Sequence, residues 1–138
     1  MYSLEKTKEF NSQCMLGEGL FVNENHLFWL DIERKSILSS GETIFTDLPF
    51  IPTVIFDFEQ PNILMGTDLG IVKFNITTGQ FSVLSPLTTK IEKEFRSNDG
   101  GLLQDKTLLG FMHMHSPDTN PGFILSFNEN VQTKIDGA

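Results

Sequence analysis

The feature that most constrains this chain is a repeated series of short runs rich in β-branched and aromatic residues, with almost no helical periodicity. The runs fall into three groups of four, separated by turns built from Asn, Gly, Pro and Asp. The second run of each group begins near His26, Ile63 and Thr107, which are 37 and 44 residues apart. A period of about 40–50 residues with four strands per unit is typical of β-propeller blades. Short, evenly spaced strands also suit a β-sandwich, so periodicity alone leaves both folds open.

The expected organisation is a single all-β domain over residues 1–138. Its three four-stranded units would cover residues 14–47, 52–84 and 95–135. Leu20, Thr53 and Gly101 are expected to begin the first strand of each unit, and the irregular stretch Ser85–Glu94 is expected to connect the second unit to the third. No linker or low-complexity segment divides the chain.

Composition excludes several classes of function. The net charge of −8 and the pI near 4.7 argue against binding to nucleic acid or to an anionic membrane surface. No apolar run approaches the length of a membrane span, and the first ten residues lack an apolar signal segment. Cys14 is the only cysteine, so no internal disulfide can form, which favours a reducing, cytoplasmic location.

A glycine-flanked carboxylate is the first candidate for chemistry. Glu18 stands in Leu16-Gly17-Glu18-Gly19, and the run Leu27–Ile32 follows shortly after. The two glycines let the backbone bend and come close to another group. A carboxylate held there is a hard oxygen ligand for Ca²⁺, Mg²⁺, Mn²⁺ or Zn²⁺. The alternative interpretation is a solvated acid in a glycine-rich turn.

The second candidate is Arg96-Ser97-Asn98-Asp99-Gly100. Arginine supplies fixed N–H donors suited to a carbonyl or a hydroxyl-rich ligand, and an asparagine amide both donates and accepts. Asp-Gly is common turn chemistry, so a plain polar turn before a strand is the competing interpretation.

Together these two motifs resemble the family of senescence marker protein (regucalcin), gluconolactonase and luciferin-regenerating enzyme. The resemblance runs from about Cys14 to Ile135 and corresponds to the N-terminal half of a family member. It implies half of a six-bladed β-propeller that holds a divalent cation on its axis and opens sugar lactones. It also implies that Glu18 binds the metal and that Arg96 and Asn98 face the substrate.

The stretch Gly110–His115 departs from that family, whose members read Gly-Thr-Met here, often with an acidic, substrate-facing residue shortly after. This chain has Phe111, His113 and His115 instead. The two histidines could chelate a transition metal from one face of a strand, but the favoured interpretation is two partly exposed side chains where a strand enters a loop. If a pocket exists, His115 is the better candidate to line it. By the same comparison, Asp31 is expected to be mainly structural.

The expected function is a truncated, lactonase-like protein: a metal-dependent sugar-lactone hydrolase with weak or absent activity. The family's remaining ligands, an asparagine and an aspartate that doubles as candidate base, belong to the other half of the propeller, so no catalytic residue is assigned here. The alternative is a non-catalytic module that binds a small ligand or a protein.

The partner expected for a half-propeller is a second copy of the same chain. In half a propeller the first and third units each leave one face uncovered, roughly 300 Å² apiece for strands of about five residues. A homodimer would bury roughly 1,200 Å² in all and close a six-bladed ring. Its axis would then carry two copies of Glu18 and of Asn98.

Overall fold

The computed structural model describes residues 5, 9–10, 12–23, 25–129 and 131–137, and within them the chain forms β-strands and no helix. The first sheet contains β1 (Gly17–Val22), β2 (Leu27–Asp31), β3 (Ser36–Ser39) and β4 (Glu42–Phe45). The second contains β5 (Pro52–Glu59), β6 (Asn62–Thr67), β7 (Gly70–Asn75) and β8 (Phe81–Pro86). The third contains β9 (Phe95–Leu103), β10 (Lys106–His113), β11 (Phe123–Asn128) and β12 (Val131–Asp136).

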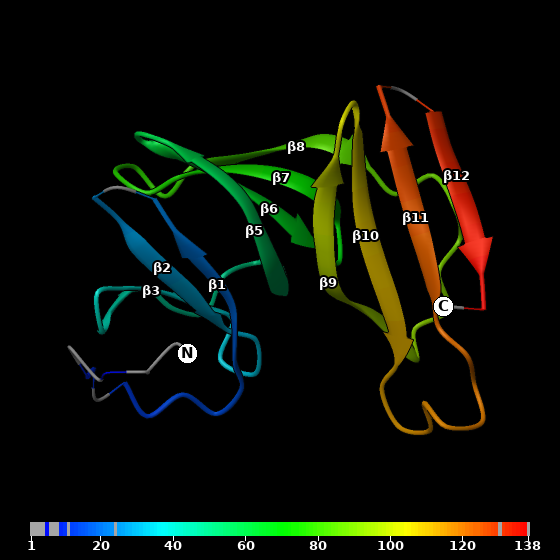
Figure 1. The fold of residues 1–138 in the computed structure, drawn as a ribbon, viewed down its shortest axis with the longest axis horizontal. Coiled ribbons are helices and arrows are strands. Elements are labelled where there is room, and N and C mark those ends of the chain that lie inside the picture. The colour runs from blue at the N-terminus through cyan, green and yellow to red at the C-terminus, as the bar shows by residue number, and fades with distance from the viewer. Residues whose placement is uncertain (1–4, 6–8, 11, 24, 130, 138) are drawn as a thin grey trace.

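Each sheet is an antiparallel meander in which consecutive strands are neighbours. The first strands of the three sheets lie together, with β1 packed against β5 and β5 packed against β9. Figure 1 shows that these inner strands run in the same direction and begin at the lower end of the view. Residues at the start of β1, β5 and β9 therefore lie at one end of the molecule. The all-β fold with three four-stranded blades is confirmed.

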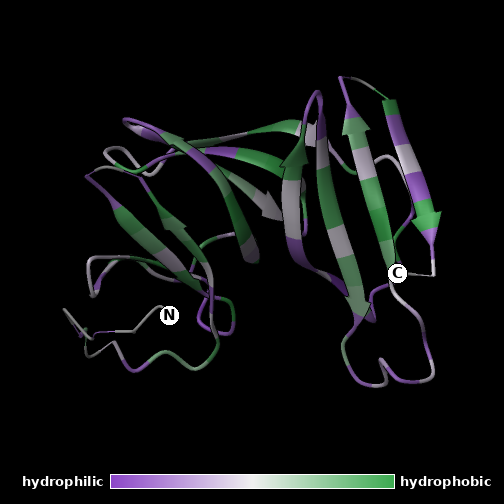
Figure 2. Cartoon of the chain, viewed as in Figure 1, coloured by the Kyte–Doolittle hydropathy of each residue, from purple (hydrophilic) through white to green (hydrophobic). Residues whose placement is uncertain are grey.

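The hydrophobic core consists of two layers, one on each face of the second sheet. Phe28, Leu30 and Ile37 of the first sheet pack on one face against residues such as Met65 and Phe74. The opposite face packs against the third sheet, and the buried residues of that layer are Val54, Phe56, Ile71, Leu109, Phe111, Phe123, Leu125 and Phe127. The hydrophobic bands along β5, β10 and β11 in Figure 2 correspond to these layers. Because both faces of the second sheet are covered, β5 is buried over most of its length.

The structure differs from the sequence-based expectation at the start of two inner strands. β1 begins at Gly17 rather than Leu20, and β9 begins at Phe95 rather than Gly101. Both added segments contain an irregularity in the ladder. In β9, two residues, Asn98 and Asp99, stand opposite the single residue Gly110. Such bulges accommodate polar and glycine residues that a regular strand pattern disfavours, so the candidate motifs belong to strands and not to turns.

The outer faces of the first and third sheets are covered to different extents. Phe10 packs on Trp29 with ring centroids 5.8 Å apart, so the chain covers part of its own first sheet. Trp29 therefore has a packing role in the first sheet. On the third sheet, Leu103, Val131 and Ile135 are each about half exposed or more. The part of the chain that the structure describes contains no helix long and apolar enough to cross a membrane.

Candidate functional site

Glu18 lies near the start of β1, opposite Leu30, with its side chain exposed. The next residue, Gly19, has φ of +64°, which favours glycine. A side chain at Gly19 would also collide with Leu30, since an added Cβ would stand 2.9 Å from Leu30 Cδ1. The same position approaches the backbone oxygen of Thr53 in β5. Gly19 therefore allows β1 to pack closely on β5 beside Glu18.

Asp31 anchors the segment that leads into β1. Its carboxylate accepts hydrogen bonds from the backbone N–H of Met15 at 2.9 Å and of Leu16 at 3.1 Å, and a longer one from Arg34 N–H at 3.4 Å. Burial opposes the charged form, but these N–H donors and the Arg34 guanidinium outweigh it and hold the pKa of Asp31 below its usual range. Asp31 thus fixes the backbone two residues before Glu18 and agrees with the structural role expected for it.

A buried pair of hydroxyl groups joins the inner strands of the second and third sheets. Thr53 Oγ1 and Ser97 Oγ are 2.8 Å apart, and both residues are almost completely buried. The single Thr53 hydroxyl proton goes to the Gly66 carbonyl oxygen at 3.2 Å, so Ser97 donates to Thr53. Sequence reasoning missed this pair because the two residues are 44 positions apart and neither carries a local signal.

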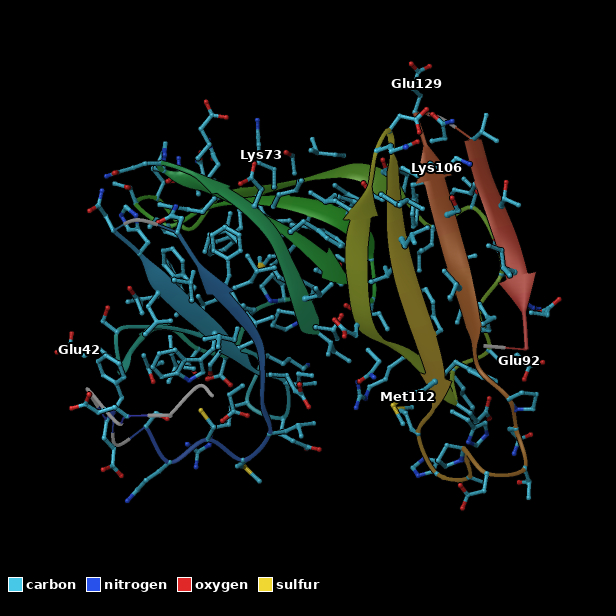
Figure 3. All side chains as sticks on the ribbon, in the orientation of Figure 1. Glu42, Lys73, Glu92, Lys106, Met112 and Glu129 are labelled. Atoms are coloured by element: carbon cyan, nitrogen blue, oxygen red, sulfur yellow. The ribbon has the colours of Figure 1, made fainter. Side chains whose placement is uncertain are left out.

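Arg96 and Asn98 flank Ser97, and the structure brings their side chains together. Arg96 Nη1 donates to Asn98 Oδ1 at 3.1 Å and to the Ser97 carbonyl oxygen at 2.9 Å. Both side chains are half-buried. Arg96 pairs with Met112, which Figure 3 places at the lower end of β10, opposite the end that carries Lys106. The pair therefore lies at the end of the molecule where β1 and β5 also begin.

His115 lies in the loop after β10, which ends at His113. The two histidines therefore do not share a strand face. His113 Nδ1 accepts hydrogen bonds from the backbone N–H groups of His115 at 3.2 Å and Ser116 at 3.0 Å. That nitrogen is occupied in shaping the turn, which disfavours a metal chelate between the two rings. The His115 side chain itself is exposed.

A pocket of about 240 Å³ opens beside Arg96, between the second and third sheets and the connecting segment 87–94. Its lining residues are Ile51, Asp68, Leu87, Ile91, Glu92, Lys93, Phe95, Arg96, Ser97, Phe111 and Met114. Arg96 is the one predicted site residue among them. Within the described ranges, no hydrogen bond or ion pair joins Glu18 or His115 to Arg96 or Asn98.

The described residues do not form a complete cation site. No group of three or more His, Cys, Asp or Glu side chains among them could hold a metal ion. Glu18 contributes one exposed carboxylate, whereas Ca²⁺ in proteins takes about 6–8 oxygen ligands. Any cation at Glu18 would therefore need further oxygen ligands from outside this set.

The fold and the site define a class of protein: a set of β-propeller blades whose inner strands present polar side chains at one end. Residues 16–137 match the family model described as the SMP-30/Gluconolactonase/LRE-like region. The chain belongs to this family, which confirms the resemblance inferred from the two motifs.

Comparison with solved structures agrees on the fold. Regucalcin from Agrobacterium tumefaciens, described as a calcium-binding protein, superposes with a TM-score of 0.73 at 22% sequence identity. The match covers 90% of this chain and 44% of that one, so the chain spans less than half the length of this relative. The computationally designed Ika8 protein has a TM-score of 0.42 at 11% identity, over 88% of this chain and 46% of that one. No curated protein matches the sequence.

Proposed function

We propose that this chain forms the ligand-holding part of a lactonase-like propeller and binds a sugar lactone or sugar acid through Arg96 and Asn98. The observation that carries the proposal is the 3.1 Å hydrogen bond that orders these two side chains at the start of an inner strand. His115, in the neighbouring loop, is proposed to contact the same ligand. The cytoplasm is the proposed location, in keeping with the single cysteine.

The chemistry of the pair suits an oxygen-rich ligand. Arg96 uses Nη1 for its two contacts within the strand, which leaves the N–H groups on Nη2 and Nε for a carbonyl or carboxylate oxygen. Asn98 accepts from Arg96 through Oδ1, so its NH₂ group can donate to a hydroxyl or ring oxygen. The pair therefore offers several donors in a fixed arrangement.

Hydrolysis is proposed to be weak or absent. A general base contributes about 10²–10⁴-fold to such reactions, and no described residue is assigned that role. Small misplacement of the reacting groups costs about another 10²-fold. We therefore expect ligand binding to be retained even if hydrolysis is not. A non-catalytic binding module is the second candidate function.

A divalent cation is proposed to bind weakly at Glu18. The Agrobacterium regucalcin is described as calcium-binding, and this chain belongs to the same family, which supports Ca²⁺ as the first ion to test, with Zn²⁺, Mn²⁺ and Mg²⁺ as alternatives. The affinity should be low because one chain supplies a single carboxylate.

Replacing Arg96 by glutamine should weaken the binding of gluconate about tenfold, since a charge-assisted hydrogen bond is lost from the ligand. Isothermal titration with gluconate measures this change. Lys106→Gln is the matched control, because it removes one positive charge from the opposite end of the same hairpin.

The same titrations separate the possible outcomes. Equal weakening in Arg96→Gln and Lys106→Gln would mean that only net charge matters, and the proposed site would be wrong.

Ca²⁺ binding should weaken in Glu18→Gln and not in Glu42→Gln, an exposed glutamate of the same sheet. Robust opening of gluconolactone that disappears in Glu18→Gln would show that the chain is a complete enzyme.

We expect the three sheets to act as one domain that self-associates through the outer face of the third sheet. The strand register places Leu103, Leu108, Met112, Ile124, Val131 and Ile135 on that face, opposite the side that packs on the second sheet. Lys106, Ser126 and Thr133 lie on the same face. Several exposed apolar side chains on one sheet face are uncommon on a monomer, and a second copy could cover them.

The expected result is a dimer at micromolar concentration in sedimentation velocity experiments. Ile135→Lys should shift the equilibrium to monomer, because it places a charge in the middle of the contact. Lys134→Ala, on the opposite face of the same strand, is the control that should remain dimeric. A wild-type protein that sediments as a 15.6 kDa monomer would contradict the proposal.

A further inference from the structure

We propose that the 240 Å³ pocket beside Arg96 binds an apolar substituent of the ligand, so that the preferred ligand is an alkyl-substituted lactone or hydroxy acid rather than a fully hydroxylated sugar acid. This inference rests on the proposed function and narrows its substrate class. The carbonyl or carboxylate of the ligand would meet Arg96, and its hydrocarbon part would enter the pocket.

The walls of the pocket are mainly hydrocarbon and aromatic. Among the lining residues, Phe111 is 5% exposed, and Phe95, Leu87 and Ile91 are half-buried. Met114 also lines the pocket and is 41% exposed. Such a lining stabilises a buried hydrocarbon group by removing it from water.

Two polar side chains of the pocket lining, Ser97 and Asp68, have hydrogen-bond partners within the protein. Ser97 Oγ donates to Thr53, and Asp68 Oδ1 accepts from the backbone N–H of Ile51 at 2.7 Å. Glu92 and Lys93 are exposed and carry opposite charges. Glu92, Lys93 and Arg96 are the polar partners that remain for a ligand, and hydroxyl groups buried against the apolar walls would be unpaired, which is costly. Arg96 keeps the N–H groups on Nη2 and Nε for a ligand, and the exposed Lys93 ammonium in the same lining carries further N–H donors.

Hydrogen bonds near both ends of the connecting segment 87–94 fix this wall of the pocket. Gln132 of β12 accepts from the backbone N–H of Thr88 at 3.0 Å and donates to the carbonyl oxygen of Pro86. At the other end, the backbone N–H of Met114 donates to the carbonyl oxygen of Glu94 at 2.8 Å. A preformed apolar pocket next to a charged donor is typical of small-molecule sites.

The test is a titration of the protein with 5-hydroxyalkanoates of increasing chain length, from five to ten carbons, with gluconate measured in parallel. Each methylene group that enters the pocket should tighten binding about fourfold, which corresponds to about 0.8 kcal/mol per buried CH₂. Met114→Gln should reduce this gain severalfold, a larger change than it makes to gluconate binding. Met15→Gln, an exposed methionine away from the pocket, is the control.

A second variant and an unfolding measurement distinguish loss of the pocket from a change in folding. Ile91→Gln, in the connecting segment, should also reduce the chain-length gain, and urea unfolding of both variants checks that the protein stays folded. If gluconate binds through Arg96 but affinity does not depend on chain length, the inference is wrong and the proposed function stands. If neither gluconate nor the hydroxyalkanoates bind, both are wrong. Equal chain-length gains in wild type, Met114→Gln and Ile91→Gln would also overturn the inference.

Discussion

Replacing Gly100 by alanine is expected to lower the free energy of unfolding by about 3 kcal/mol or more. A Cβ at this position would clash with the carbonyl oxygen of Leu108 in the paired strand, because the two atoms would be much closer than van der Waals contact allows. It would also stand 3.0 Å from Phe56 Cε1, a buried side chain of the second sheet. The Leu108 backbone lies on one side of this position and the buried Phe56 ring on the other, so neither group can move away without disturbing the packing.

Gly101→Ala provides a matched control one residue away. No atom lies within 4 Å of a Cβ built there, and its φ is outside the positive region. Its effect should stay within about 0.5 kcal/mol. Urea unfolding followed by Trp29 fluorescence measures both variants. Similar stabilities of Gly100→Ala and Gly101→Ala would contradict the tight packing of β9 against β10.

The same substitution should affect ligand binding. Gly100 follows the bulge at Asn98 and Asp99, so moving β9 away from β10 displaces the residues on both sides of Ser97. Under conditions where Gly100→Ala remains folded, gluconate binding should weaken along with stability. Gly101→Ala should bind as the wild type does.

Asp31→Ala is expected to destabilise the protein by about 3 kcal/mol. The substitution leaves the backbone N–H groups of Met15 and Leu16 without their carboxylate acceptor, and each such loss costs about 1–3 kcal/mol. Asp105→Ala, an exposed turn residue, is the control and should change stability by less than about 0.5 kcal/mol. Chemical unfolding at neutral pH measures the difference, and equal effects of the two variants would contradict the anchoring role.

The contribution of Asp31 should also depend on pH. Because folding lowers the pKa of its carboxyl group, the charged form stabilises the folded state at pH values above the unfolded pKa of about 3.9. That stabilisation is lost as pH falls through the lower pKa of the folded state. The stability difference between wild type and Asp31→Asn should therefore be full at pH 6 and shrink below about pH 4. A difference that stays constant down to pH 2.5 would show that the carboxylate charge is not what matters.

The repeated strand pattern was enough to predict an all-β chain with three groups of four strands, because alternating burial and turn chemistry are local properties. Two motifs added the family resemblance, which the family model confirms, and made Arg96 and Asn98 candidates for ligand binding. The bounds of the inner strands were not predictable in the same way. The sequence pattern predicts a strand only from Gly101. The preceding segment, residues 95–100, joins the strand because β10 supplies hydrogen-bond partners and a bulge accommodates Asn98 and Asp99.

By itself, then, the sequence of this protein determined which segments form strands, how the strands group in fours, and which residue types are available for chemistry. Only the tertiary structure decided that Ser97 donates to Thr53 across two sheets, that His113 Nδ1 is occupied by its own loop, and that an apolar pocket opens beside Arg96. The physical reason is that periodicity and turn preferences act over a few residues. The contacts between inner strands join residues 34 positions apart (Gly19 and Thr53) and 44 positions apart (Thr53 and Ser97), and they exist only once the sheets have packed.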